Sequence, residues 1–164
     1  MLFLCPKGRW FIIITLKDIN IAIVKQVTAG LVDTKYSTTV FSSTDIVEEI
    51  IRPCFYFDIL HNKTNLMLQH AEERSLELQL FYFTTTRTGA KIEVFEMEDL
   101  LSEIFKDNLK ITDDYFVSIH GCDFDTNKTD GYLILNIELD TFEELEDEGI
   151  EMLEELVTEL KINL

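Results

Sequence analysis

Apolar residues recur every three or four positions in three stretches of the chain, a spacing that places them on one side of an α-helix. In residues 17–32 the recurring residues are Ile19, Ile23, Val27 and Leu31. In residues 90–108 they are Met97, Leu101, Ile104 and Phe105, and in residues 149–160 they are Ile150, Leu153, Val157 and Leu160. The pattern predicts three amphipathic helices, each with one side packed on another part of the molecule.

Apolar and polar residues alternate in other stretches, as they do in β-strands that bury one face. The stretches are residues 55–59, 76–82, 115–125 and 132–142. In the last of them we expect Leu133, Leu135, Ile137 and Leu139 to point inward, and Asn136, Glu138 and Asp140 to point outward. Residues 126–131 are turn formers that end in Asp-Gly, which predicts a hairpin between the last two strands.

Three segments between these elements give weaker signals. Residues 35–43 are rich in Thr, Tyr and Val and predict a short strand, and residues 45–51 allow at most a short helical turn before Pro53. Residues 62–73 are polar at both ends. We expect them to form a long excursion in which two strands extend past the body of the sheet.

The order helix, short strand, two strands, helix, two strands, helix is typical of an α+β fold. We expect a central antiparallel sheet of about four strands flanked by helices. With six Gly, two Pro and no internal repeat, 164 residues predict a single domain over residues 1–164. Residues 1–15 would be an apolar amino-terminal extension, and residues 143–164 would contain the acidic last helix.

Charge excludes one large class of partner. The 14 basic and 31 acidic residues give a net charge of −17, whereas nucleic-acid binding needs a basic surface. The charge is uneven, because residues 1–70 hold seven basic and six acidic groups and residues 71–164 hold seven and 25. The apolar runs near the amino terminus are too short for a membrane span or a signal peptide, so we expect neither.

The usual signatures of catalysis and of metal or cofactor binding are weak or missing. Neither GxGxxG nor GxxxxGK[ST] occurs, and the segment that starts at Asp123 lacks the Gly and Glu of a calcium loop. Three scattered cysteines predict a reducing compartment, and Cys54 is expected to be a small buried residue. We therefore predict no catalytic residue, metal or cofactor. A small enzyme stays an unsupported alternative.

Four segments are familiar in combination. They are Ile51-Arg-Pro-Cys-Phe-Tyr-Phe-Asp-Ile-Leu, Glu73-Arg-Ser-Leu-Glu-Leu-Gln-Leu-Phe-Tyr-Phe, Glu96-Met-Glu-Asp-Leu-Leu-Ser-Glu-Ile-Phe and Asp130-Gly-Tyr-Leu. Their succession resembles small neck proteins of tailed phages and prophages of Gram-positive bacteria, of the tail terminator (tail completion) type. The similarity spans roughly residues 16–145.

The resemblance implies an α+β subunit that forms a six-membered ring or collar, caps the tail tube and joins it to the neck. It implies contacts with the tail tube protein and with the sheath or head–tail connector, in a virion or a tailocin assembled in the bacterial cytoplasm. It supplies no catalytic residues, so we expect a structural protein and not an enzyme. DNA would pass through the ring without specific binding, and no membrane would be involved.

Charge and hydrophobicity suggest where such a ring would use its surfaces. We expect Glu138, Asp140, Glu151 and Glu155 at the channel or its rim, where carboxylates would keep DNA from sticking. The alternative is that they only keep a waiting monomer soluble. Phe3, Trp10, Phe11 and Ile12 are the candidate oligomer interface, unless this segment packs on the sheet as an extra strand. In a different functional class, the acidity would fit a DNA-mimicking inhibitor.

Overall fold

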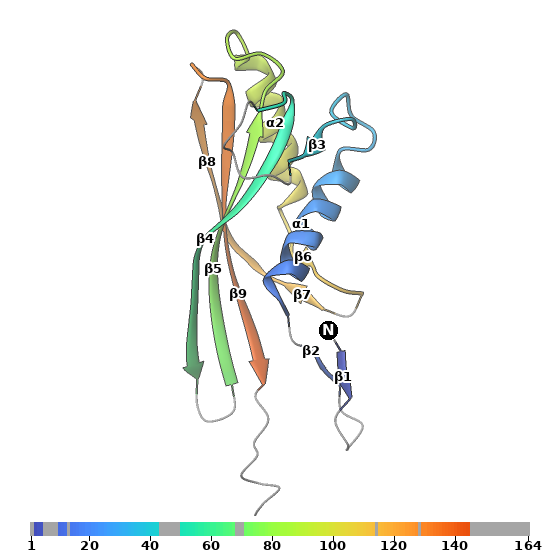
Figure 1. Ribbon diagram of the computed structural model, residues 1–164, viewed down its shortest axis with the longest axis vertical. Helices are drawn as coiled ribbons and strands as arrows, with labels where there is room; N and C mark the ends of the chain where they lie inside the picture. Colours follow the sequence, from blue (N-terminus) through green and yellow to red (C-terminus); the bar gives the residue numbers. More distant parts are fainter. Residues whose placement is uncertain are drawn as a thin grey trace, which may run out of the picture.

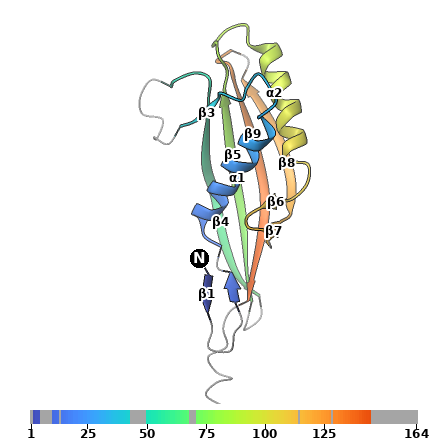
Figure 2. The same cartoon turned by 90° about the vertical axis from the view of Figure 1, so that its right-hand side faces the viewer.

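The computed structural model describes residues 2–4, 10–12, 14–42, 50–67, 71–113, 115–127 and 129–144, with the strands at 2–4 and 10–12 and residues 143–144 described by their backbone. It has a layer of sheet and a layer of helices, and both helices lie on the same face of the sheet (Figures 1 and 2). The predicted α+β class is confirmed. The predicted helix at 149–160 and residues 45–49 of the predicted turn lie outside the described residues.

The main sheet has five strands in the order β3-β4-β5-β9-β8. Their bounds are β3 (Val40–Phe41), β4 (Cys54–Met67), β5 (Ala71–Phe83), β8 (Ile119–Asn127) and β9 (Tyr132–Glu144). All pairs are antiparallel except β3 with β4, which is parallel, so the sheet is mixed and has one strand more than expected. A two-residue strand is too short to show an alternation, so the sequence pattern could not reveal its direction.

β4 and β5 do continue into the segment 62–73, as predicted, but β9 pairs along the whole of β5, so these strands lengthen the sheet and do not run past it. β4 and β5 stay paired from Cys54 opposite Phe83 to Met67 opposite Ala71, with one irregularity between Ile59 and His61. The lower part of this hairpin runs beyond the end of the helical layer (Figure 1).

Helix α1 (Leu16–Gly30) begins at a capping box. The Thr15 hydroxyl accepts from the Asp18 backbone N–H at 3.2 Å, and the Asp18 carboxylate accepts from the Thr15 backbone N–H at 3.0 Å, so the two residues pair reciprocally at the start of the helix. Helix α2 (Lys91–Ile104) ends four residues before the predicted boundary. The short strands β6 (Leu109–Lys110) and β7 (Phe116–Val117) pair with each other after it.

The core lies between the helices and one face of the sheet. The helices contribute Ile19, Ile23, Val27, Val94, Met97 and Leu101. The sheet contributes Phe55, Leu76, Leu78, Leu80, Tyr82, Leu133, Leu135, Ile137 and Leu139. The predicted inward positions of the last strand are thus confirmed. No helix in the described part of the chain is long and apolar enough to cross a membrane.

The two helices are in close contact at Gly30. A Cβ built on this glycine would lie 2.4 Å from Cγ1 of Ile104 and 2.6 Å from its Cδ1. Gln26, one turn earlier, donates from Nε2 to the Ile104 carbonyl at 2.8 Å and accepts from the Lys110 backbone N–H at 3.4 Å. The end of α1 is therefore fixed against the end of α2 by close packing and by one side-chain amide.

We expect Gly30→Ala to destabilise the protein by about 1–2 kcal/mol, because Ile104 is stiff at its branched Cβ and must move. Without the clash, alanine at this helical position would be stabilising by up to about 1 kcal/mol. The same substitution in an Ile104→Ala background should therefore be neutral or stabilising. Urea unfolding of the four proteins in this double-mutant cycle measures the coupling, and equal effects of Gly30→Ala in both backgrounds would contradict it.

Candidate functional site

The face of the sheet opposite the helices is not covered by any described element (Figure 1). Because neighbouring strand residues point to opposite faces, the residues between the buried core positions point to this side. We call this surface the open face. Its main side chains are Tyr56, Asp58, His61, Lys63, Glu77, Gln79, Phe81, Phe83, Asp123, Asp125, Tyr132, Ile134, Asn136, Glu138 and Asp140.

One end of the open face is aromatic. Ring centroids lie 5.9 Å apart for Tyr56 and Phe81, 6.3 Å for Phe81 and Phe83, and 5.9 Å for Phe83 and Tyr132. These distances are typical of favourable aromatic pairs. The chain of rings crosses three strands and covers this end of the sheet with its own side chains.

Toward the other end the open face is acidic and hollow. A depression of about 280 Å³ is lined by His61, Ser75, Leu76, Glu77, His120, Glu138, Leu139 and Asp140. His120 Nε2 lies 3.3 Å from Asp140 Oδ2. Three carboxylates and two imidazoles from four strands thus share one concave surface, which favours cations and repels phosphates.

Two of the four predicted channel residues lie in this depression. The backbone pairing places Glu138 and Asp140 on the open face, as the alternation predicted. The other two, Glu151 and Glu155, lie outside the described residues. A role of any of the four at a channel stays a prediction.

The predicted apolar interface lies in a separate hairpin, β1 (Leu2–Leu4) with β2 (Trp10–Ile12). Its register places Phe3 opposite Phe11, Leu4 opposite Trp10 and Leu2 opposite Ile12. The two strands pair with each other and form a sheet of their own. The alternative of an extra strand in the main sheet is therefore not what the structure shows, while the interface role stays a prediction.

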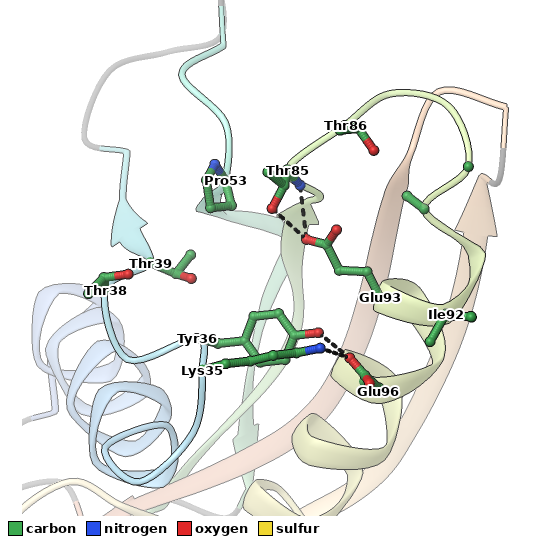
Figure 3. Close-up of a pocket in the computed structure, with 12 residues that line it drawn as sticks. Lys35, Tyr36, Thr38, Thr39, Pro53, Thr85, Thr86, Ile92, Glu93 and Glu96 are labelled. Carbon is green, nitrogen blue, oxygen red and sulfur yellow. Dashed lines mark hydrogen bonds and ion pairs between the residues drawn. The ribbon is translucent and has the colours of Figure 1, made fainter.

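A second hollow, of about 510 Å³, lies on the helical side between the segment after α1 and the amino-terminal end of α2 (Figure 3). Two carboxylates brace it. The Tyr36 hydroxyl donates to Glu96 at 2.6 Å, and Lys35 pairs with the same carboxylate. Glu93 Oε1 accepts from the Tyr82 hydroxyl at 2.7 Å and from the Thr85 backbone N–H at 2.9 Å.

These contacts shift pKa values in the directions expected of a structural brace. Burial, helped by the hydrogen bond to Glu96, raises the pKa of Tyr36 to about 12. Hydrogen bonds from Lys35 and Tyr36 lower the pKa of Glu96, and the same contact raises the pKa of Lys35. The tyrosine therefore stays protonated and the carboxylate stays ionised at neutral pH, so neither group is poised for acid–base catalysis there.

We expect acid to weaken this brace. The pKa of Glu96 in the folded chain lies below its ordinary value of 4.5, so its stabilising contribution is present above that pH and is lost as the pH falls through the folded pKa. Unfolding free energy measured from about pH 5 to about pH 3 should fall more steeply for the wild type than for Glu96→Gln. Parallel curves for the two proteins would contradict the assignment.

The described residues offer little support for a metal site or a nucleophilic cysteine. They contain no group of three or more His, Cys, Asp or Glu side chains arranged to hold a metal ion. Burial raises the pKa values of the Cys54 and Cys122 thiols, which disfavours the nucleophilic thiolate. Cys54 is the small buried residue that the sequence suggested.

The sequence reasoning missed the role of Arg52, which fastens three strand ends together. Its guanidinium donates to the carbonyl oxygens of Thr84 at 3.2 Å, Gly131 at 2.7 Å and Asp130 at 3.0 Å. It also lies 5.4 Å from the centre of the Phe83 ring. We call Arg52, Thr84, Asp130 and Gly131 the arginine clamp. In the sequence, the residues of the clamp stand out only as parts of two separate motifs, Arg-Pro-Cys-Phe and Asp-Gly-Tyr-Leu.

No curated protein matches the chain. The family model of the phage tail terminator protein matches residues 18–151, which include all but the first two residues of α1, the whole of α2, all five strands of the main sheet and the arginine clamp. The matched region covers most of the 164 residues. The chain belongs to the phage tail terminator protein family.

Proposed function

We propose that this chain forms a ring of six copies that caps the phage tail tube, stops its growth and joins it to the neck. The observation that carries the proposal is the family match over residues 18–151, since this family consists of structural proteins of the phage tail. The chain is accordingly a tail component that contacts other tail proteins. The number of copies and the capping role are the parts that require a test.

The open face supports a ring with an inner wall. Helices cover only one face of the sheet, so the other face is available to line a channel (Figures 1 and 2). This face carries Glu77, Glu138 and Asp140 in one depression. A carboxylate-lined wall would repel the phosphates of passing DNA.

The first experiment is the mass in solution by light scattering coupled to size exclusion, with and without purified tail tubes. We expect a species of about six times 19.1 kDa, or a monomer that forms this ring at tube ends. A monomer that ignores tubes would contradict the proposal. It would leave the DNA-mimicking inhibitor as the next candidate, which inhibition of nucleases would test.

The channel role is tested separately with Glu138→Gln, Asp140→Asn, Glu151→Gln and Glu155→Gln combined. If these carboxylates face the channel or its rim, particles that carry the variant should eject DNA more slowly at low salt, where the charges are least screened. Unchanged ejection from normally assembled particles would favour the alternative, in which the charges only maintain solubility. The prediction would also fail if the tail belongs to a headless particle, because no DNA then passes through the ring.

Deletion of residues 1–12 tests the proposed interface at Phe3, Trp10, Phe11 and Ile12. If the β1–β2 hairpin contacts a neighbouring subunit, the truncated chain should fold and fail to form the ring. A truncated chain that loses its cooperative unfolding transition would show instead that the hairpin stabilises its own subunit.

A further inference from the structure

The main sheet has two edges that the described elements leave largely unpaired. β8 forms one edge, and no described strand lies beyond it. At the other edge, β3 pairs with β4 only at Cys54 and Phe55. The remaining length of β4, down to Met67, has no described strand on its outer side. Unpaired edges of this length are templates for pairing with another chain.

The lower part of the β4 edge also exposes large apolar side chains. Leu60 is 50% exposed, Leu66 is 72% exposed and Met67 is 46% exposed. An exposed apolar edge strand is costly in a soluble monomer unless a partner covers it. This part of β4 is therefore available for pairing with another chain.

We propose that β8 of one copy pairs, antiparallel, with the lower part of β4 of the next copy, so that the sheets of the ring join into a closed barrel. This inference rests on the proposed ring and specifies its subunit contact. The strand directions permit it, because β4, β5, β9 and β8 alternate in direction. With four long strands in each copy, β8 runs opposite to β4, so copies related by rotation continue the antiparallel alternation.

Hydrogen-bond directions decide which residues would meet. Phe55 accepts from the Ser42 N–H with its carbonyl, so its backbone groups point to the outer side of β4. The backbone groups of every second residue of β4 share this direction, and the irregularity after Ile59 shifts the alternation by one residue. The backbone groups of Asn62 and Thr64 therefore point to the outer side of β4. When the same alternation is followed through the pairs of β5 with β9 and of β9 with β8, the backbone groups of Cys122 and Phe124 point to the outer side of β8.

Charge selects one register among those that these directions allow. Placing Thr64 opposite Cys122 puts Lys63 opposite Asp123 and His61 opposite Asp125. All four of these charged or titratable side chains lie on the open face. Oppositely charged residues directly across a strand pair are stabilising, whereas a shift by two residues would break one of the two pairs. Asn62 then lies opposite Phe124.

The same register has the stagger that a barrel requires. Within one copy, Cys122 aligns with Ile59 through Ile137 and Leu78. In the proposed contact, Cys122 would pair with Thr64 of the next copy, which is five positions after Ile59 along β4. One of these five positions is the extra residue at the irregularity, Leu60. The offset is therefore about four residues for four strands. A ratio of about one residue per strand corresponds to a strand tilt of about 36°, as in eight-stranded barrels.

The direction of the stagger agrees with an inward-facing open face. Seen from the helical side, β4, β5, β9 and β8 follow one another from left to right (Figure 2). The strands of a barrel tilt in a right-handed sense about its axis. A row of residues paired across neighbouring strands therefore slopes downward when it is followed to the right on the outside of the barrel. The row of paired residues that starts at Ile59 in one copy must then reach β4 of the next copy at a lower position. Thr64 lies in this lower part of β4. Roughly 24 strands about 4.8 Å apart would enclose a wide channel.

Disulfide trapping tests the register directly. In a Cys5→Ser background, Thr64→Cys should form covalent multimers with the native Cys122 on mild oxidation of assembled rings, because the expected Cα separation of about 5.5 Å suits a disulfide. Asn62→Cys, two residues away on the same face, is the matched control and should cross-link roughly tenfold less. Adding Cys122→Ser should abolish the multimers. A ring in which Thr64→Cys cross-links no better than Asn62→Cys would overturn the register.

Charge exchange gives a second measurement that does not depend on cysteines. Lys63→Glu and Asp123→Lys should each weaken every contact by roughly fivefold and lower the fraction of ring, and the double variant should restore it. Lys17→Glu makes the same charge change on the exposed side of α1 and should leave the ring intact. Circular dichroism checks that each variant folds.

The outcomes separate this inference from the proposed function. A wild-type chain that never forms a ring, with or without tubes, contradicts the proposed function and the inference with it. A wild-type ring that tolerates Lys63→Glu as well as Lys17→Glu overturns the edge pairing alone. A ring lost in both single variants and regained in the double variant supports the pairing of β8 with β4.

Discussion

Replacement of Gly131 by alanine should destabilise the folded chain by about 3–4 kcal/mol. Gly131 has a φ of +61°, a conformation that residues with a Cβ rarely adopt. An added Cβ would also lie 2.5 Å from the Thr84 hydroxyl oxygen, 2.7 Å from the Thr86 carbonyl oxygen and 2.8 Å from the Arg87 carbonyl oxygen. Two of these neighbours are backbone atoms, so the turn itself must move.

Gly89 provides a matched control for this substitution. It has a φ of +79°, and a Cβ built on it would meet nothing within 4 Å. Gly89→Ala should therefore cost only the conformational penalty, about 1 kcal/mol. Urea unfolding of both variants isolates the steric part as the difference between them. Equal losses would show that the close packing around Gly131 adds no steric cost.

Arg52→Ala should lower the free energy of unfolding by about 2–3 kcal/mol. The guanidinium donates to three carbonyl oxygens, and charged hydrogen bonds of this kind are stronger than neutral ones. Its stacking on Phe83 would also be lost. The estimate stays below the sum of three such bonds, because the Gly131 carbonyl keeps the Thr84 hydroxyl at 2.8 Å as a partner.

Arg52→Lys distinguishes the shape of the side chain from its charge. A lysine keeps the positive charge but cannot donate from a planar fork to several carbonyl groups at once. We expect this variant to lose at least half as much stability as Arg52→Ala. A lysine variant as stable as the wild type would mean that charge alone maintains the contact. Equal urea m-values in all variants would confirm that the unfolding reaction is the same.

The arginine clamp joins two segments that lie far apart in the sequence. Arg52 precedes β4, and Asp130 and Gly131 form the turn between β8 and β9, so the contact joins residues almost eighty positions apart. It fixes the start of β4 against the start of β9. These strands lie on either side of β5 and carry much of the open face. The motif therefore fixes the geometry of the surface that we propose as an inner wall.

Local sequence patterns predicted most of the secondary structure. The four-residue spacing located α1, and the capping box of Thr15 and Asp18 fixes its first turn. Alternation assigned Glu138 and Asp140 to the outer side of their strand. Both signals depend on residues that are neighbours along the chain, which is why the period of the pattern is sufficient to reveal them. The net charge of −17 likewise followed from counting alone.

The depression on the open face shows what such patterns omit. His61, Glu77 and His120 come from three strands and meet Glu138 and Asp140 only because β9 inserts between β5 and β8. Nothing local to any one of these strands encodes that order. The short strand β6 and the division of the predicted strand at 115–125 into β7 and β8 were missed for a related reason, because two residues cannot establish a period.

The α+β class, the positions of the described helices and long strands, the acidic character of the chain and its resemblance to tail terminators could all be predicted from the sequence. The strand order, the covering of one sheet face by both helices, the contacts of Arg52 and the two unpaired edges became visible in the folded chain alone. The difference arises because propensity and periodicity act between neighbouring residues. Strand order, clamps and edges depend instead on which distant segments bury one another's apolar surface and satisfy one another's backbone groups.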